Sequence, residues 1–416
     1  MSPKVHCFWN RTNSIVEWTG SNDFEEYSMG RLRFGAFVAP HHAVGQNPTV
    51  ALQRDLELVE HLDRLDFDEV WIGEHHSAGS EIIGSPEIFI AAAAERTKRI
   101  KLGTGVTSLS YHNPLWVADR LVLLDHLTRG RVMLGVGPGS LPTDSAMIGL
   151  NPTECRELLE DNLDIVVRLL NGERVTAKTK THNLVDAQLQ LRPYSHPMFD
   201  IVVAGVSSPT GPRLAGKHGL GLLSIGATLT PEGFDALGHH FGIMEERATE
   251  FGTAVDRDQW RLVCPMHIAE TEEQAQEDVR FGLGEWIDYF GKVAAFPHFG
   301  SGGADMEQMI AYMNHSGMGV IGTPAQAREL IGKLVDQSGG FGSMLIMGTD
   351  WANPAATRRS FELIAQQVAP HFQGQSQPTF DAATRAGKVR ESHNEAQHAA
   401  IAHMTKKYED ELAAKA

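Results

Sequence analysis

Cysteine is scarce in this chain. The 416 residues contain 3 cysteines, Cys7, Cys155 and Cys264, which lie far apart and form no CxxC pair. An odd, dispersed set of this kind favours neither a disulfide framework nor a zinc knuckle, and it is consistent with a reducing compartment. The scarcity of cysteine therefore indicates a cytoplasmic protein.

Positive charge and long apolar runs are also scarce. The formal net charge is −16, which repels nucleic-acid phosphates and anionic membrane surfaces. The longest apolar stretches, such as Ile88 to Ala94, are far shorter than the roughly 20 residues of a membrane-spanning helix. The first thirty residues also lack the apolar centre of a signal peptide. We therefore expect neither nucleic acid nor a membrane as a partner.

The sequence lacks the motifs of several enzyme classes. Gly135-x-Gly137-x-Gly139 is not the GxGxxG fingerprint of a nicotinamide site, and no acidic residue follows it to bind a ribose. Gly205-Val206-Ser207-Ser208-Pro209 lacks the closing glycine of a hydrolase nucleophile elbow. HExxH does not occur. We predict no metal site, although a metal-dependent barrel hydrolase stays open, with candidate ligands His41, His75, His267 and Asp350.

The chain does contain a regular alternation of apolar strand candidates with helical patterns, many of which begin with proline. The eight strand candidates are Leu32 to Val38, Glu69 to Gly73, Ile100 to Thr107, Arg131 to Gly137, Asp200 to Ala204, Gly221 to Ile225, Arg261 to Ile268 and Ser343 to Gly348. Several are continuously apolar, as in a parallel sheet covered by helices. We predict the α/β class, as an eight-stranded β/α (TIM) barrel with insertions and a C-terminal extension.

Three segments are expected around this barrel. Residues 1–29 form a polar N-terminal extension, residues 30–373 the barrel, and residues 374–416 a polar helical or flexible tail. Within the barrel, Val175 to Leu191 has the alternation of a hairpin. Lys292 to Gly322 is rich in glycine and methionine, and we interpret it as a mobile lid. The predicted helix Glu272 to Tyr289 precedes this lid.

The end of each strand is where chemistry is expected, because active sites of β/α barrels lie at the carboxyl ends of the strands. Glu74-His75-His76 follows the apolar run Val70-Trp71-Ile72, and adjacent side chains on a strand point to opposite faces. One of the two histidines is therefore the stronger catalytic candidate. Glycines follow three strands, and the hydroxyls of Ser207, Ser208 and Thr210 precede a helix start that suits phosphate. These features indicate a phosphorylated cofactor.

Taken together, these motifs resemble the luciferase-like flavin monooxygenases. The resemblance covers roughly Leu32 to Phe372. The motifs that carry it are Arg33-Phe34-Gly35, Phe67-Asp68-x-x-Trp71-x-x-Glu74-His75-His76, Leu102-Gly103-Thr104, Asn113-Pro114, Leu124-Asp125, Gly130-Arg131, Val202-Val203-Ala204 and Gly322-Thr323-Pro324. The family implies a β/α barrel that binds reduced FMN, supplied by a separate NADH- or NADPH-dependent flavin reductase, and transfers one oxygen atom to a small apolar substrate such as a terpene, ketone, aldehyde or alkane.

The resemblance also assigns roles to residues. His75 matches the catalytic histidine of the family, expected as a neutral imidazole that moves or holds a proton. The residues expected to hold the cofactor are Gly105, Val106, Gly137, Pro138, Gly139, Ser140, Ser207, Ser208, Thr210 and Gly211. Those expected at the substrate are Phe37, His76, Ser224 and Trp286. Luciferase has a cysteine and a phosphate-binding arginine where this chain has Gly137 and Pro138, so Arg213 or Arg156 would have to neutralise the phosphate.

Two alternatives accompany this prediction. Relatives in the same superfamily use a deazaflavin coenzyme for hydride transfer, and a barrel by itself does not distinguish an enzyme from a non-catalytic flavin-binding protein. Barrels of this family are often dimers, so we also expect a homodimer.

Overall fold

The computed structural model describes residues 31–38, 41–139, 141–225, 231–294, 305–317, 319–348 and 350–415. The predicted extension over residues 1–29 lies outside these ranges. So do Ser140 and part of the predicted lid, namely residues 295–304 and Met318.

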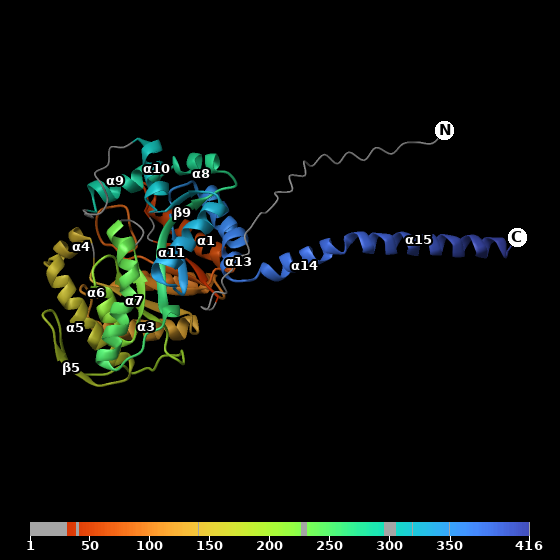
Figure 1. Cartoon of the computed structure of the whole chain (residues 1–416). Helices are drawn as coiled ribbons and strands as arrows, with labels where there is room; N and C mark the ends of the chain where they lie inside the picture. Colours follow the sequence, from red (N-terminus) through yellow and green to blue (C-terminus); the bar gives the residue numbers. More distant parts are fainter. Residues whose placement is uncertain are drawn as a thin grey trace.

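Within the described ranges, eight parallel strands close into a barrel (Figure 1). They follow one another around the ring in chain order, and the last pairs with the first. They are β1 (Arg33–Val38), β2 (Glu69–Ile72), β3 (Lys101–Ser108), β4 (Val132–Gly137), β7 (Ile201–Gly205), β8 (Gly221–Ser224), β9 (Trp260–Ile268) and β11 (Ser343–Met347). The predicted β/α barrel and its eight strand candidates are confirmed.

Helices cover the outside of this barrel, and their starts are encoded locally. Proline occupies the first turn of many of them, and the side chains of Asn47, Asn113 and Asn151 accept backbone N–H bonds at three of the starts. The helices that precede the tail are α1 (Pro48–Arg64), α2 (Pro86–Arg96), α3 (Pro114–Thr128), α4 (Pro142–Met147), α5 (Pro152–Leu170), α6 (Thr210–His218), α7 (Pro231–Phe251), α8 (Glu272–Val279), α9 (Leu283–Lys292), α10 (Met306–Ser316), α11 (Pro324–Ser338), α12 (Pro354–Leu363) and α13 (Ala369–Phe372).

Alternation along the strands divides the apolar core in two. On β2, Val70 and Ile72 belong to the outer layer that packs under the helices, whereas Trp71 belongs to the cluster inside the barrel. Trp71 is fully buried, and a Cβ on Gly103 would lie 2.5 Å from its ring. The apolar interior is thus filled by a side chain so large that a neighbouring strand must carry glycine.

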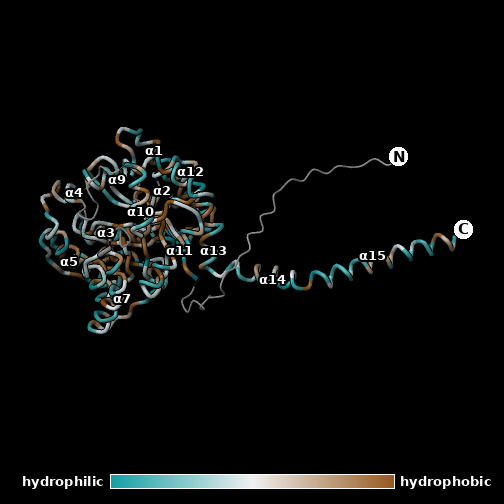
Figure 2. Tube along the Cα trace, turned by 45° about the horizontal axis from the view of Figure 1, so that its top comes forward, coloured by the Kyte–Doolittle hydropathy of each residue, from teal (hydrophilic) through white to brown (hydrophobic). Residues whose placement is uncertain are grey.

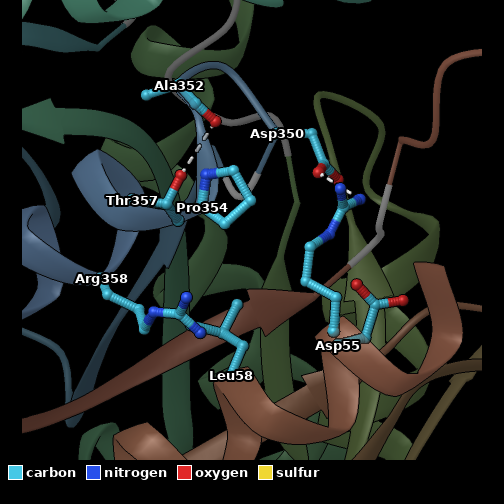
Figure 3. Close-up of a pocket in the computed structure, with 8 residues that line it drawn as sticks. Asp55, Leu58, Asp350, Ala352, Pro354, Thr357 and Arg358 are labelled. Atoms are coloured by element: carbon cyan, nitrogen blue, oxygen red, sulfur yellow. Dashed lines mark hydrogen bonds and ion pairs between the residues drawn. The ribbon is translucent and has the colours of Figure 1, made fainter. Parts of the chain in front are cut away.

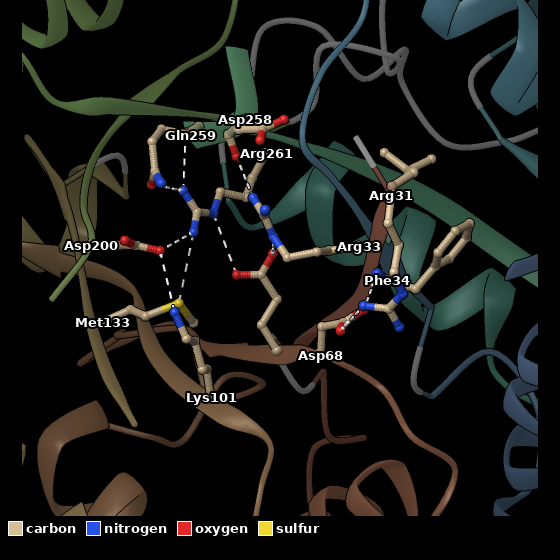
Figure 4. A network of polar contacts seen from close by, with 12 residues as sticks. Arg31, Arg33, Phe34, Asp68, Lys101, Met133, Asp200, Asp258, Gln259 and Arg261 are labelled. Carbon is tan, nitrogen blue, oxygen red and sulfur yellow. Dashed lines mark hydrogen bonds and ion pairs between the residues drawn. The ribbon is translucent and has the colours of Figure 1, made fainter. Parts of the chain in front are cut away.

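The amino end of the barrel is closed by a buried ionic network (Figure 4). The Arg261 side chain is 1% exposed and pairs with Glu69 at 3.4 Å and with Asp200. It also donates to the Gln259 carbonyl at 3.0 Å. A cavity of about 290 Å³ lies at this end beside Lys101. The buried guanidinium is the central cation between these two carboxylates, while Arg33 lies 3.9 Å from Glu69 and Lys101 lies 3.8 Å from Asp200 at the edge of the network.

Three predicted elements differ from those observed. The helix expected from Glu272 to Tyr289 breaks into α8 and α9, because the Gly282 N–H donates to the Trp351 carbonyl (3.0 Å) and a Cβ at that glycine would lie 2.1 Å from the Asp350 carbonyl. The described part of the lid contains α10 and a further strand, β10 (Val320–Gly322), which pairs in parallel with β9. The closing helix includes a π-helical turn over Ile364–Val368.

The remaining elements lie outside the barrel. The predicted hairpin is present as β5 (Val175–Lys178) and β6 (Asn183–Ala187), paired antiparallel. The tail forms α14 (Gln377–Lys388) and α15 (Arg390–Ala413), which extend away from the barrel and alternate between polar and apolar residues (Figures 1 and 2). No helix over the described ranges has the length and apolar character needed to cross a membrane.

Candidate active site at the carboxyl end of the barrel

Both ring nitrogens of His75 face carboxylates. The residue is the third after the end of β2, and its Nδ1 lies 3.0 Å from an oxygen of Asp144, in the first turn of α4. Its Nε2 lies 3.3 Å from an oxygen of Glu81, in the loop between β2 and α2. Glu81 in turn accepts a hydrogen bond of 2.8 Å from the buried Tyr289 hydroxyl on α9. One loop and two helices, α4 and α9, thus hold the His75 imidazole in place.

These carboxylates control the charge of His75. Burial by itself lowers the pKa of the ring, but the carboxylates of Glu81 and Asp144 outweigh burial and raise the pKa to about 9. The ring is therefore an imidazolium at neutral pH. The expectation of a neutral imidazole is wrong for this arrangement, because the sequence does not show that two acidic side chains converge on it.

His76 points away from His75 and joins a second polar cluster. Its Nε2 lies 2.9 Å from Oε1 of Glu74, and the Nε2 of His112 lies 2.6 Å from the same oxygen. The other oxygen of Glu74 accepts the Ser108 backbone N–H at 2.8 Å. These hydrogen bonds, led by that from His112, outweigh burial and lower the pKa of Glu74 to about 2. The cluster ties the end of β2 to the end of β3.

The glycines predicted at the cofactor lie together beside this cluster. In β3 the pairing register with β4 shifts between Thr104 and Thr107, and the Gly105–Val106 peptide bond within the shift is cis. Val106 lies so near Gly137 that a Cβ there would be 2.7 Å from its Cγ2. Gly139 has a positive φ of 79°, and a Cβ there would be 2.2 Å from the Tyr111 hydroxyl. The ends of β3 and β4 thus pack Val106 against Gly137 and Tyr111 against Gly139.

The residues predicted at a phosphate lie at the start of α6. Ser207 and Ser208 precede the helix in the loop after β7, and no side chain caps its first turn. A Cβ on Gly211 would lie 2.4 Å from the Ala204 carbonyl, so this turn packs directly on β7. Of the two arginine candidates, Arg213 lies in this helix and is 3.8 Å from Glu160. Arg156 donates to the Pro152 carbonyl within α5.

The predicted substrate residues separate into two groups. Phe37 and Trp286 belong to the apolar cluster that fills the barrel interior and reaches its mouth, where Trp286 packs against Trp351 at a centroid distance of 5.1 Å. Ser224 is fully buried, and its hydroxyl accepts a hydrogen bond of 2.9 Å from the Trp260 indole. Because Trp260 belongs to the outer layer under the helices, Ser224 faces that layer and not the barrel mouth. Its prediction as a pocket residue is wrong.

Known proteins with related sequences share this arrangement of elements. A sequence profile described as luciferase-like monooxygenase matches residues 32–341. Limonene 1,2-monooxygenase from Rhodococcus erythropolis is 48% identical over 385 residues, which cover 92% of this chain and 98% of that protein. The chain belongs to the luciferase-like monooxygenase family. The predicted resemblance, and with it the prediction of a flavin-dependent monooxygenase, is confirmed.

Two further relatives place the chain within this family. 4-Hydroxyprotoasukamycin monooxygenase from Streptomyces nodosus subsp. asukaensis is 42% identical over 83% of this chain and 94% of that protein. The solved structure of the oxygenating constituent of 3,6-diketocamphane monooxygenase from Pseudomonas putida, in complex with FMN, has a TM-score of 0.66 and 26% identity. The structural match covers 82% of this chain and 98% of the chain in that structure.

The ligands expected of a barrel metallohydrolase do not come together in this family member. His41 packs edge-on against Tyr289, and His267 is 3.1 Å from Asp278. Asp350 is 2.9 Å from Arg54, beside a hollow of about 20 Å³, which is space for little more than one water molecule (Figure 3). That alternative set of metal ligands is therefore wrong, because each member has a separate partner.

Sequence reasoning missed the residues that surround His75. Asp144 and Glu81 lie in segments without helix or strand periodicity, and Tyr289 was expected inside one long helix. A signal was available for Asp144 alone, since Pro142 two residues earlier marks a helix start after the fourth strand. Nothing local indicates Glu81 or Tyr289, which are 208 residues apart.

Proposed function

We propose that this chain is the oxygenating component of an FMN-dependent monooxygenase that acts on a small apolar substrate of the terpene or cyclic ketone class. Reduced FMN, supplied by a separate NADH- or NADPH-dependent reductase, provides two electrons, so that one oxygen atom of O₂ enters the substrate and the other leaves as water. A homodimer and a cytoplasmic location remain predictions.

The observation that carries the proposal is His75 held between two carboxylates at the carboxyl end of the barrel, in a chain that spans 98% of limonene 1,2-monooxygenase. The backbone of Gly105 and Val106 and the loop that begins at Gly137, at the ends of β3 and β4, would support the flat ring. The hydroxyls and first backbone N–H groups of α6 suit its phosphate, with Arg213 as the nearby cation.

This chain's own residues would perform three tasks in that reaction. Asp144 and Glu81 orient the His75 ring and keep a proton on it, so that Nε2 can deliver the proton when its contact with Glu81 opens. Trp286 and Trp351 give the mouth an apolar wall that excludes water. Phe37 extends that wall into the barrel beside Gly105.

The first test is an anaerobic titration of the protein with reduced FMN and, separately, reduced deazaflavin, followed by tryptophan fluorescence. Preferential binding of reduced FMN is expected, whereas a preference for deazaflavin would favour hydride transfer. Turnover with a flavin reductase, NADH and limonene or cyclic ketones should then give oxygenated product. Production of hydrogen peroxide alone with every substrate, or slow oxidation of bound flavin without product, would contradict the proposal.

His75→Asn tests the assigned role. The variant should bind reduced FMN as the wild type does but lose about 10²- to 10⁴-fold in product formation, the range that a positioned acid or base contributes. His126→Asn, at an exposed histidine on α3, is the matched control and should retain full activity. Equal product yield in both variants would remove His75 from the mechanism.

A further inference from the structure

We propose that Glu74, His76 and His112 form a binding site for one divalent transition-metal ion of the zinc class. The three ligand atoms, a carboxylate oxygen and two imidazole nitrogens, lie within 4.8 Å of one another. Over the described residues, this is the one group of histidine, cysteine and acidic side chains whose ligand atoms converge in this way. Two imidazoles and one carboxylate are an established donor set for zinc.

The hydrogen bonds within the group show where the ion would lie. The Nε2 atoms of His76 and His112 both approach Oε1 of Glu74, at 2.9 and 2.6 Å. Since a carboxylate only accepts, two N–H protons converge on one oxygen, in the space where a cation would replace them. Ligands at about 2.0 to 2.1 Å from zinc in tetrahedral geometry are about 3.3 Å apart, so the imidazoles would need to move by about half an ångström.

The three ligands differ in burial: Glu74 is buried and held in place, whereas the two histidines are partly exposed and can move. The Glu74 side chain is 1% exposed, and the Ser108 backbone N–H holds its second oxygen at 2.8 Å. A hydrogen bond of this kind orients a ligating carboxylate. The side chains of His76 and His112 are 31% and 22% exposed, so they can shift and an ion can enter from solvent. The fourth position would be left to water.

The site is adjacent to His75 but separate from its contacts. Asp144 bonds to His75 through one oxygen and to the His76 backbone N–H through the other, so the two clusters share a backbone segment and no ligand atom. A bound ion would therefore restrain the segment that carries His75. We expect occupancy to slow oxygen transfer, an effect that rests on the proposed function, whereas the binding itself does not.

Binding is tested on the full chain after treatment with a chelator. Zinc chloride is titrated in competition with a chromophoric chelator, and cobalt chloride is followed by its visible absorption. The wild type should bind one ion, and His112→Ala should bind it at least about tenfold more weakly. His398→Ala, at an exposed histidine of the tail, should leave the affinity unchanged.

A second variant separates a metal ligand from a structural hydrogen-bond donor. His112→Gln keeps an N–H donor for Glu74 but removes the imidazole nitrogen that binds metal. It should melt at the wild-type temperature in the absence of metal and still lose the ion. Equal zinc affinity in the wild type, His112→Gln and His112→Ala, or no zinc bound by the wild type at about 100 μM, would overturn the proposal.

Discussion

The two ends of the barrel both bury charge, but they do so with different cations. At the amino end, Arg261 is held among two carboxylates and the Gln259 side chain, and a guanidinium cannot lose its proton in a protein. At the carboxyl end, imidazoles face Glu74, Glu81 and Asp144, and their charge depends on pH. The cation at the amino end therefore keeps its charge at every pH, whereas the cations at the carboxyl end can lose theirs as the pH rises.

This contrast agrees with the different roles of the two ends of β/α barrels. The amino end carries features of stability, and the carboxyl end carries loops that can differ in chemistry. Arg261 also packs against Trp71, with its guanidinium carbon 5.5 Å from the ring centroid. The buried ionic network therefore supports the side chain that fills the barrel interior. His75, by contrast, stands on a loop whose partners come from other loops and from α9.

Removing the fixed cation should have the largest effect. Arg261→Met leaves Glu69 and Asp200 buried without their central cation, and we expect a loss of about 3 to 5 kcal/mol in the free energy of unfolding. Urea denaturation measures it. Lys101→Met is the control, because that ammonium is half exposed and 3.8 Å from Asp200, and it should cost less than about 1 kcal/mol. Equal losses of unfolding free energy in both variants would refute the central role of Arg261 in this network.

Changing the charge at the other end should alter pH dependence. Glu81→Gln removes the carboxylate near Nε2 of His75, so the pKa of that ring, about 9, should fall by roughly 1 to 2 pH units. The raised pKa stabilises the wild type fully below about pH 6.5, and this stabilisation is lost as pH rises through 9. In the variant the loss should occur at lower pH.

Urea denaturation between about pH 6 and pH 10 tests this shift, and the pH profile of product formation should move in the same direction. Glu157→Gln makes the same substitution at an exposed position of α5 and should leave both curves in place. Curves of Glu81→Gln that coincide with the wild type would mean that Glu81 does not control the charge of His75.

The buried His240, which has no carboxylate partner, should affect the pH dependence of stability in the opposite direction to His75. His240 on α7 is 1% exposed, neither ring nitrogen has a hydrogen-bond partner within the described structure, and burial lowers its pKa to about 4. Stability is therefore lost as pH falls from about 6.5 towards 4. His240→Leu should gain about 2 kcal/mol relative to the wild type on going from pH 7.5 to pH 5.

Two exposed histidines provide the controls for this comparison. His239 is exposed on the same helix, and its charge helps to lower the pKa of His240, so His239→Leu should weaken the acid dependence slightly, whereas His393→Leu in the exposed tail should leave it unchanged. Urea denaturation at the two pH values distinguishes the variants. A His240→Leu curve parallel to that of the wild type would show that the buried ring accepts a proton without cost.

The smallest expected effect concerns the link from α9 to His75. Tyr289→Phe removes the hydroxyl that donates to Glu81 at 2.8 Å but keeps the ring, so we expect a loss of about 1 kcal/mol in stability. Tyr312→Phe, at an exposed tyrosine of α10, should change nothing measurable. If thermal denaturation finds the two variants equal to the wild type, the hydrogen bond contributes little to fixing Glu81.

The sequence by itself determined the barrel and the place of its site. Eight apolar runs, proline at helix starts and asparagine caps are local signals, because the periodicity of a strand or helix is set by its own backbone. The same alternation located His75 in the loop that begins at the carboxyl end of β2. It also brought the predicted glycines of β3 and β4 to one edge, since the carboxyl ends of parallel strands meet there.

Only the tertiary structure decided the charge of His75 and the direction of Ser224. Asp144 and Glu81 reach the imidazole from separate loops, and Tyr289 joins them from a helix more than two hundred residues away. Ser224 faces the outer layer because of its place in the strand alternation, and a shift of one position along a strand moves a side chain between the inner and outer layers. Contacts between segments distant in the chain leave no periodic pattern in the sequence, whereas pKa and orientation depend on those contacts.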